Sequence, residues 1–314
     1  MKKGGPEISK FTVHMAAVLA MLFWGFSFIL SKFVFCFYTP LTTIFFRLLI
    51  SVLFLFFYLY VTGQFEKLKK KDLWLFLGGA VFNPFLYFIG ENYGLQRVSA
   101  SVTSIIIATI PVFTPFFAWY VFKEHIRKIN IIGLIVSFLG LILIIVNRQF
   151  QIVGSPSGIL LLFMAVFAAI IYTLFLKKLS FSYKPVTIIA WQNLIGLFLF
   201  APFFIVNDFK EVLHINPGVK GLAALFSLGI LCSSVAFVLY AYSIKHIGVI
   251  KSNLYTNLVP VIASLAAFFI LKESFTLQKI IGMIIVIFGV VLSELNTSGN
   301  IFKFNRKKEW KRKK

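Results

Sequence analysis

The stretch PVFTPFFAWYVFKEHIRKINIIG at residues 111–133 has a counterpart 149 positions later, PVIASLAAFFILKESFTLQKIIG at residues 260–282. Extending the comparison without a gap to 93–143 and 242–292 gives 12 identical positions out of 51. Ile and Leu match by chance in apolar sequence, but here a proline, a Lys-Glu pair and two glycines match in one register. Self-similarity at a fixed offset indicates an internal repeat, so we predict that the chain consists of two related halves.

The composition outside this stretch is typical of a membrane protein. Of the 314 residues, 60% are hydrophobic and 13% are charged, whereas soluble domains have roughly 45–50% and 25%. The net charge of +21 could suit a nucleic-acid-binding protein, but nearly all charges lie in short runs between long apolar stretches. We therefore expect contact with the lipid bilayer and none with nucleic acid.

About 20 apolar residues are needed for a helix to cross the hydrocarbon core, and continuous apolar runs without alternation exclude a β-barrel. The sequence therefore predicts an all-α polytopic membrane protein with ten transmembrane helices. The predicted helices are 12–36, 41–62, 72–94, 98–122, 128–147, 157–177, 185–206, 217–243, 249–271 and 277–295.

The two halves contain five predicted helices each, and five is an odd number. The second half must therefore enter the membrane in the inverted orientation. With the N-terminus in the cytoplasm, 23 Lys and Arg residues fall on the inner side and 7 on the outer side, leaving Arg47 inside a helix. Because positive residues accumulate on the cytoplasmic side, we predict a multi-pass protein of the cell (inner or plasma) membrane with both termini in the cytoplasm.

One combination of residues recurs in both halves: a proline inside a helix, a glutamate at its end and a glycine nine residues later. These are Pro111, Glu124 and Gly133, and again Pro260, Glu273 and Gly282. Together with Trp24-Gly25 and the segment from Pro40 to Arg47, the pattern resembles the drug/metabolite transporter superfamily, in its EamA-type ten-helix branch. The resemblance extends over residues 12–295 and implies two inverted five-helix repeats that transport small metabolites, often outward.

The expected domain organisation follows from the repeat. A first EamA-like five-helix repeat is predicted at 12–147, a second at 157–295, and a basic cytoplasmic tail at 296–314. The tail would fix the topology of the last helix through the positive-inside rule. Inverted repeats place a substrate site near the midplane, where the two halves meet.

Ionisable side chains inside a membrane span are functional candidates. Arg47 and Glu91 are predicted to lie at similar depth in the second and third helices. Arg47 could bind an anion and Glu91 could take up a proton, or the two could form a structural pair that spares each an unpaired charge in lipid. The sequence leaves both interpretations open.

Polar and aromatic residues at helical spacing complete the candidate site, because polar faces in lipid turn toward a cavity or a partner helix. Pro84 beside Asn83 is expected to kink the third helix, and Gln192 takes the place of Arg47 in the second half. The candidate substrate-binding residues are Trp24, Arg47, Asn83, Tyr87, Glu91, Tyr172, Gln192, Asn253 and Asn257.

The ninth predicted helix gives the most specific expectation about a cavity. Pro260 has no N–H, so the carbonyl of Thr256 lacks its usual partner. Asn253, Asn257 and Ser264 share one face and are expected to line the pathway. Leu254 and Leu258 should then face lipid or a packed helix. Hydrogen bonding between helices is the alternative use of these polar residues.

Other recurring residues are predicted to be structural. Glu124 and Glu273 lie at helix ends, where a carboxylate complements the N-terminus of the helix that follows. Small residues allow close helix contact, and the glycines of each half are seven positions apart on one face. They are Gly133 and Gly140 in the first half and Gly282 and Gly289 in the second.

These features together predict a secondary transporter of small organic metabolites, amino acid-like or drug-like solutes, that works by alternating access and could act in efflux. The expected partners are a small-molecule substrate, the lipid bilayer, and a proton or another coupling ion. No cofactor or metal is expected, because the four histidines are scattered without ligand spacing. The alternative is a polytopic membrane enzyme acting on lipid substrates, which would need a catalytic constellation that the sequence does not contain.

The predicted topology can be tested by cysteine labelling after Cys36 and Cys232 are replaced. A cysteine introduced at Asn216 should react with a membrane-impermeant thiol reagent in intact cells, whereas one at Ser298 should react only after permeabilisation. Labelling of position 298 in intact cells would contradict the even number of spans and the inversion that depends on it.

Overall fold

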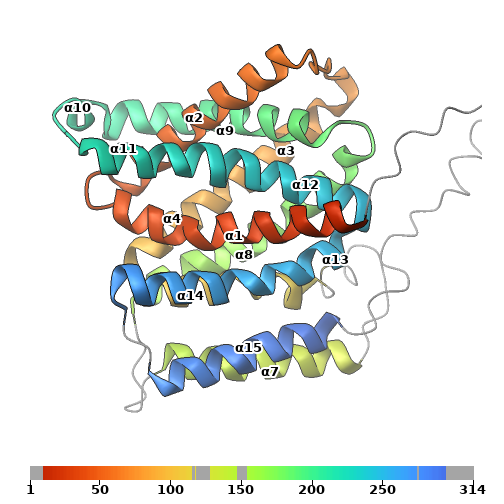
Figure 1. The fold of residues 1–314 in the computed structure, drawn as a ribbon, viewed down its shortest axis with the longest axis vertical. Helices are drawn as coiled ribbons and strands as arrows, with labels where there is room; N and C mark the ends of the chain where they lie inside the picture. Colours follow the sequence, from red (N-terminus) through yellow and green to blue (C-terminus); the bar gives the residue numbers. More distant parts are fainter. Residues whose placement is uncertain (1–9, 115–116, 118–127, 147–153, 274–275, 295–314) are drawn as a thin grey trace, which may run out of the picture.

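The computed structural model describes residues 10–114, 117, 128–146, 154–273 and 276–294, which form a bundle of helices (Figure 1). Within this part, 7 helical segments have at least 18 residues and are apolar enough to cross a membrane. Three shorter apolar helices accompany them, at Ala100–Thr114, Ile131–Ile145 and Leu277–Leu292. The predicted all-helical, polytopic class is confirmed, and the count of ten membrane crossings stays a prediction.

The helices of the first half begin where the sequence supplies a cap or a proline. Thr39 accepts a hydrogen bond from the Thr42 amide (3.1 Å) at the start of α2, and Pro40 occupies its first turn, where a missing N–H costs nothing. The elements are α1 (Lys10–Val34), α2 (Pro40–Val61), η1 (Lys70–Asp72), α3 (Leu73–Ala80), η2 (Val81–Leu86), α4 (Tyr87–Arg97), α5 (Ala100–Ile107) and α7 (Lys128–Ile145).

The second half follows the same plan, with Pro156 and Pro185 in the first turns of its first two helices. Its elements are α8 (Pro156–Ser180), α9 (Pro185–Asn207), α10 (Phe209–Val212), α11 (Gly218–Ser227), η3 (Leu228–Val235), α12 (Ala236–Ile247), α13 (Val249–Leu254), η4 (Tyr255–Asn257), α14 (Leu258–Leu271) and α15 (Leu277–Glu294).

Three of the long helices depart from regular α-helical geometry partway along their length. At η2 the backbone of Asn83 is extended (φ −148°, ψ 118°), directly before Pro84. At η3 the helix widens to a π-turn, where the Ser234 hydroxyl donates to the Gly229 carbonyl (2.8 Å). At η4 it tightens to a 3₁₀ turn. The predicted kink beside Pro84 is therefore confirmed, and such breaks free backbone groups inside the bundle.

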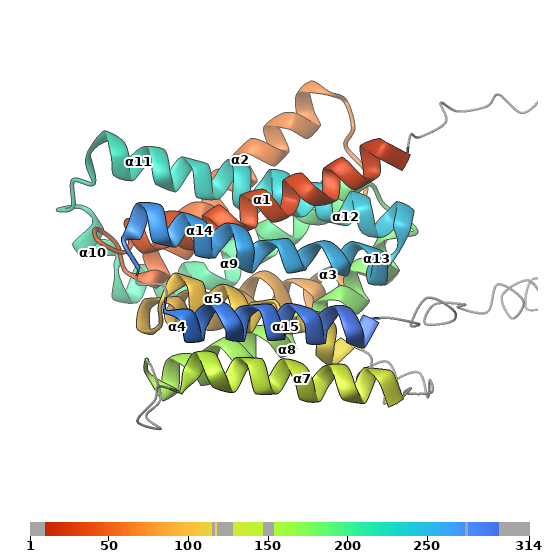
Figure 2. The same cartoon turned by 60° about the horizontal axis from the view of Figure 1, so that its bottom comes forward.

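The packing of the helices respects the sequence repeat. The second helices of the two halves, α2 and α9, pack on each other, as do the last helices, α7 and α15, which lie side by side in both views (Figures 1 and 2). The first helix of each half packs on the third segment of the other, α1 on α12 and α8 on α4. The two halves are thus interleaved, and each buries its apolar faces largely against the other.

Two acidic residues link the halves through helix N-termini. Glu66, which follows α2, accepts hydrogen bonds at the start of α9 from the Lys184 amide (2.8 Å) and the Thr187 hydroxyl (2.7 Å). Asp208, which follows α9, accepts at the start of α2 from the hydroxyls of Thr39 and Thr42. Carboxylates are favourable beside helix N-termini. Because each helix ends beside the beginning of the other, α2 and α9 run antiparallel.

Glu273 makes a third contact of this kind, with a partner that differs from the expected one. Its carboxylate accepts from the amides of Ala100 (2.8 Å) and Ser101 (3.3 Å), and from the Ser101 hydroxyl. The expectation that Glu273 complements the helix following it in sequence is wrong. It caps α5 of the other half, because interleaving brings that N-terminus closer. Glu124 lies outside the described residues.

The glycines of α7 and α15 confirm the predicted close contact. A Cβ atom built on Gly140 would lie 2.8 Å from the Gly282 carbonyl oxygen, and one built on Gly289 would lie 2.8 Å from the Gly133 carbonyl oxygen. The Ser137 hydroxyl donates to the Val286 carbonyl (3.1 Å) between these two contacts. The interface is therefore formed by backbone against backbone, which only residues without side chains permit.

The contact between α7 and α15 makes a specific prediction for stability. Gly289→Leu should lower the thermal unfolding midpoint of the detergent-purified protein, because the added side chain must displace the backbone of α7 at a cost of about 1–3 kcal/mol or more. Phe288→Leu is the matched control, since the Phe288 side chain on the same helix is 60% exposed. Equal midpoints for the two variants would contradict the interface.

Candidate functional site

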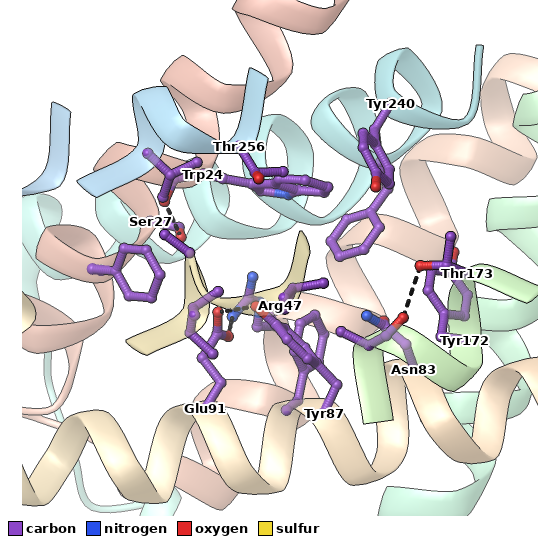
Figure 3. A pocket seen from close by; sticks show the side chains of 18 residues that line it. Trp24, Ser27, Arg47, Asn83, Tyr87, Glu91, Tyr172, Thr173, Tyr240 and Thr256 are labelled. Carbon is purple, nitrogen blue, oxygen red and sulfur yellow. Dashed lines mark hydrogen bonds and ion pairs between the residues drawn. The ribbon is translucent and has the colours of Figure 1, made fainter. Parts of the chain in front are cut away.

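A cavity of about 70 Å³ lies inside the bundle, lined by side chains from both halves. One water molecule needs roughly 10–15 Å³ of such space, so the cavity can hold several waters or part of a small solute. Figure 3 shows Arg47, Tyr87 and Glu91 gathered on one side of it, with Trp24 and Thr256 across from them. The polar and aromatic lining residues are Trp24, Ser27, Phe28, Arg47, Asn83, Tyr87, Phe88, Glu91, Tyr172, Thr173, Phe237, Tyr240 and Thr256.

Arg47 and Glu91 form a buried ion pair. Arg47 Nη1 lies 3.7 Å from Glu91 Oε2, and the side chains are only 2% and 8% exposed. The Nε of Arg47 donates to the Ser233 hydroxyl of η3 (2.8 Å), and its guanidinium lies over the Phe88 ring, 4.2 Å from the centroid. The guanidinium, which α2 supplies, is thereby held in place by side chains of two other segments, α4 and η3.

The Glu91 carboxylate is engaged on both oxygens. Tyr87, one helical turn earlier on α4, donates to Oε1 (2.9 Å), and the Asn92 amide donates to Oε2 (3.3 Å). Hydrogen bonds to charged acceptors inside a protein are strong because the medium is poorly polarisable. The pair is thus a neutral unit in which the carboxylate accepts two hydrogen bonds and the guanidinium donates one.

Three aromatic side chains from opposite halves form a second wall of the cavity. The Trp24 ring packs against Phe237 and Tyr240 of α12, with centroid separations of 4.9 Å in both cases. The Tyr240 hydroxyl donates to the side-chain oxygen of Asn253. The wall can contact an apolar group over a wide area, because aromatic side chains bury large surfaces.

Six of the nine residues predicted to bind substrate line the cavity, namely Trp24, Arg47, Asn83, Tyr87, Glu91 and Tyr172. The other three lie one layer further out. Gln192 accepts from the Tyr172 hydroxyl (3.2 Å), Asn253 accepts from Tyr240, and Asn257 is buried. The contacts of Gln192 and Asn253 support the lining side chains, and direct contact of these three residues with substrate stays a prediction.

The segment before Pro260 faces the cavity at a different position from the expected one. Thr256 lines the cavity, whereas Asn257 and Ser264 do not, and the latter two have buried polar atoms without a hydrogen-bond partner. The 3₁₀ turn of η4 rotates the chain relative to an uninterrupted α-helix, which accounts for the shift. Leu258 is 37% exposed on the outside, as expected. The Leu254 side chain lies outside the described residues.

Sequence reasoning missed Phe237, Tyr240 and Thr173. Phe237 and Tyr240 are three positions apart on one helical face, a spacing that could have indicated them. In a chain with 40 Phe and 11 Tyr residues this signal is weak. Thr173 gives no such signal. Its hydroxyl donates a hydrogen bond to the Ala169 carbonyl (2.8 Å), as threonines do in many ordinary helices.

A polar network outside the cavity holds α2, α9 and η3 together. Asn193 donates to the Ser51 hydroxyl (2.7 Å) and to the Ser233 carbonyl (3.0 Å), and Ser51 shares a hydrogen bond with Ser234 (2.6 Å). The π-turn of η3 exposes the Ser233 carbonyl to these donors. This network positions Ser233 and, through it, Arg47. Among the described residues, no group of three or more His, Cys, Asp or Glu could hold a metal ion.

An apolar multi-pass bundle with a charged internal cavity between two repeated halves is the architecture of a membrane transporter. A family profile described as "EamA-like transporter family" matches the chain twice, at residues 12–146 and 156–295. The chain therefore belongs to the EamA-like transporter family, and the resemblance to the EamA-type branch of the drug/metabolite transporter superfamily is confirmed.

Relatives of known sequence have matching lengths and transporter names. An uncharacterized transporter of Archaeoglobus fulgidus is 28% identical over 283 residues, which is 89% of this chain and 96% of that protein. The uncharacterized transporter YdfC of Bacillus subtilis is 28% identical over 266 residues, or 83% and 84% of the two chains. A crystal structure superposes with a TM-score of 0.67 over 90% of this chain and 98% of the other, at 14% identity, which supports the fold alone.

The Arg47–Glu91 pair makes a prediction for stability. Arg47→Gln should destabilise the protein by about 3–5 kcal/mol, because it leaves a buried carboxylate without its counter-charge. The double variant Arg47→Gln, Glu91→Gln should recover most of this loss, since no unpaired charge remains. Thermal unfolding and the monodisperse fraction in gel filtration measure both effects. Additive losses in the double variant would show that the two side chains do not depend on each other.

Proposed function

We propose that this protein is a secondary transporter that moves small organic solutes, amino acid-like or drug-like, across the cell membrane by alternating access between its two repeats. The observation that supports this most is the cavity itself, to which both halves contribute charged, polar and aromatic side chains. A buried charge pair is expensive inside a membrane, and the site retains one where a passing solute would meet it.

The antiparallel contact of α2 and α9 supports inverted repeats. Corresponding helices can run in opposite directions side by side only if the halves are related by an axis lying in the membrane plane. The contacts of Gly140 with Gly282 and of Gly289 with Gly133 support the same relation, because exchanging the halves interchanges these two pairs. Rocking of one half against the other would open the cavity to each side in turn, with both termini in the cytoplasm as the charge distribution predicts.

The three breaks at η2, η3 and η4 supply the means for such motion. Each lies partway along a long helix, and η2 and η4 contribute the lining residues Asn83 and Thr256. A broken helix can bend there without losing the hydrogen bonds on either side. We infer that these turns are the hinges about which the cavity opens and closes.

Transport and the cavity can be tested in one experiment on proteoliposomes, in a background without Cys36 and Cys232. A panel of labelled amino acids, organic acids and amphipathic cations is screened for flux, with and without a pH gradient. For each solute moved, a small hydrophilic methanethiosulfonate should abolish flux through Thr256→Cys and leave Leu258→Cys active, because Leu258 faces outward. No flux for any solute, or equal inhibition of both variants, would contradict the proposed function.

A further inference from the structure

The unsatisfied polar atoms of the cavity are all of one kind. Arg47 Nη1 and Trp24 Nε1 are buried without a hydrogen-bond partner, and both residues line the cavity. Among the described residues, no other side chain that lines the cavity has a buried polar atom without a hydrogen-bond partner. Both atoms are N–H donors, and a buried donor without an acceptor loses its solvation without compensation.

We propose, on the basis of the transport function above, that the substrate is a small organic monocarboxylate. Its carboxylate accepts hydrogen bonds from Arg47 Nη1 and Trp24 Nε1, and its apolar body packs against Phe237 and Tyr240. A guanidinium binds carboxylates through short, charge-assisted hydrogen bonds, which the 3.7 Å separation from Glu91 does not provide.

Cationic and uncharged ligands fit the site less well. The carboxylate of Glu91 already accepts from Tyr87 and Asn92 and lies beside Arg47. An ammonium group would have to compete with these donors while lying next to a buried guanidinium. An uncharged amide could accept from one donor but would bring no charge to complement Arg47, so a site built on unpaired donors discriminates against it.

Binding of a carboxylate also requires the site to take up a proton. In the free site the positive charge of Arg47 balances the negative charge of Glu91. A second carboxylate on Arg47 would leave one net negative charge in a buried site, and like charges at short range cannot both persist there. Glu91 therefore takes up one proton from solution, forming an O–H bond on the oxygen that faced Arg47. No bond in the substrate is made or broken, and the loaded site is neutral again.

The groups facing Glu91 leave it as the proton acceptor. The guanidinium of Arg47 on α2 has only donors, and the hydroxyl of Tyr87 on α4 donates its hydrogen bond to Glu91. Cys232 on η3 lies within electrostatic range of both members of the pair. The remaining ionisable neighbours around the cavity are Tyr172 on α8 and Tyr240 on α12, and α5 (ASVTSIII) contributes none. The transported unit is then one carboxylate with one proton, which carries no net charge.

The test measures binding to the purified full-length protein in detergent at neutral pH. Three of the probes have the same phenylpropyl body and differ in the polar group: 3-phenylpropanoate, 3-phenylpropanamide and 3-phenylpropylamine. Two further carboxylates, propanoate and indole-3-propanoate, differ in the apolar body. Calorimetry should show that a carboxylate binds at least about tenfold more tightly than the matched amide, with no measurable binding of the amine. A pH dye in weak buffer should report uptake of about one proton per carboxylate bound.

Variants separate the two donors from the proton acceptor. Glu91→Gln should bind the carboxylate without proton uptake. Trp24→Phe keeps the aromatic wall and removes the donor, so carboxylate affinity should fall about tenfold while amide affinity changes less. Trp191→Phe is its matched control, because the Trp191 N–H is also buried and unpartnered but lies outside the cavity. The double variant Arg47→Gln, Glu91→Gln, which removes both charges, should lose the preference for anions.

The binding experiment distinguishes a failure of the carboxylate proposal from a failure of the proposed transport function. Tighter binding of a carboxylate with proton uptake that Glu91→Gln abolishes supports the inference. Equal or tighter binding of the amide or amine, or carboxylate binding without proton uptake, overturns it. If none of the three carboxylates binds to protein that transports other solutes in proteoliposomes, the inference is wrong and the transport function stands. Absence of flux for every solute refutes the function itself.

Discussion

The absence of water in the hydrocarbon core is the constraint on which the rest of this structure depends. Every backbone N–H and C=O group in the core must find a partner within the protein, and the places where helices start, end or break are where this is hardest. The molecule meets the constraint at helix starts by exchange between its halves. Glu66, Asp208 and Glu273 each supply a carboxylate to an N-terminus that belongs to the other half. Neither half has its full set of caps without the other.

The same constraint explains which polar groups of the cavity have hydrogen-bond partners and which do not. Both oxygens of Glu91 accept a hydrogen bond, whereas Arg47 and Trp24 keep one donor each without an acceptor. A structural ion pair would be expected to satisfy both partners, because an unpaired donor at 2% exposure is costly. The imbalance favours a site that is completed by a ligand with acceptor atoms. The neighbouring network through Ser233 shows that this part of the bundle has polar partners available for Arg47.

Much of the architecture could be predicted from the sequence because membrane helices are specified locally. A run of about 20 apolar residues forms a helix in lipid whatever surrounds it, and Pro84 interrupts a helix through its own missing N–H. The glycine spacing predicted a close helix contact for each of the two segments, because one face of a regular helix follows from sequence position alone. Arg47 and Glu91 could be recognised as candidates in advance, with pairing as one of two interpretations, because each is an ionisable group in a segment that otherwise excludes charge.

The remaining features depend on which helices pack against each other. These contacts could not be predicted from the sequence. The partner of Glu273 is α5 and not the following helix, because interleaving of the halves places that N-terminus nearby. Thr256 replaces Asn257 at the cavity because a 3₁₀ turn changes the rotation of the chain within a few residues. Phe237 and Tyr240 became recognisable only when Trp24, more than 200 positions earlier, was found against them. Apolar runs and charge thus determined the class and the two charged candidates, since these follow from each segment's own interaction with lipid, and self-similarity of the sequence determined the repeat. The lining of the cavity was decided by tertiary structure, because contacts between distant helices select which of many similar aromatic and polar side chains face inward.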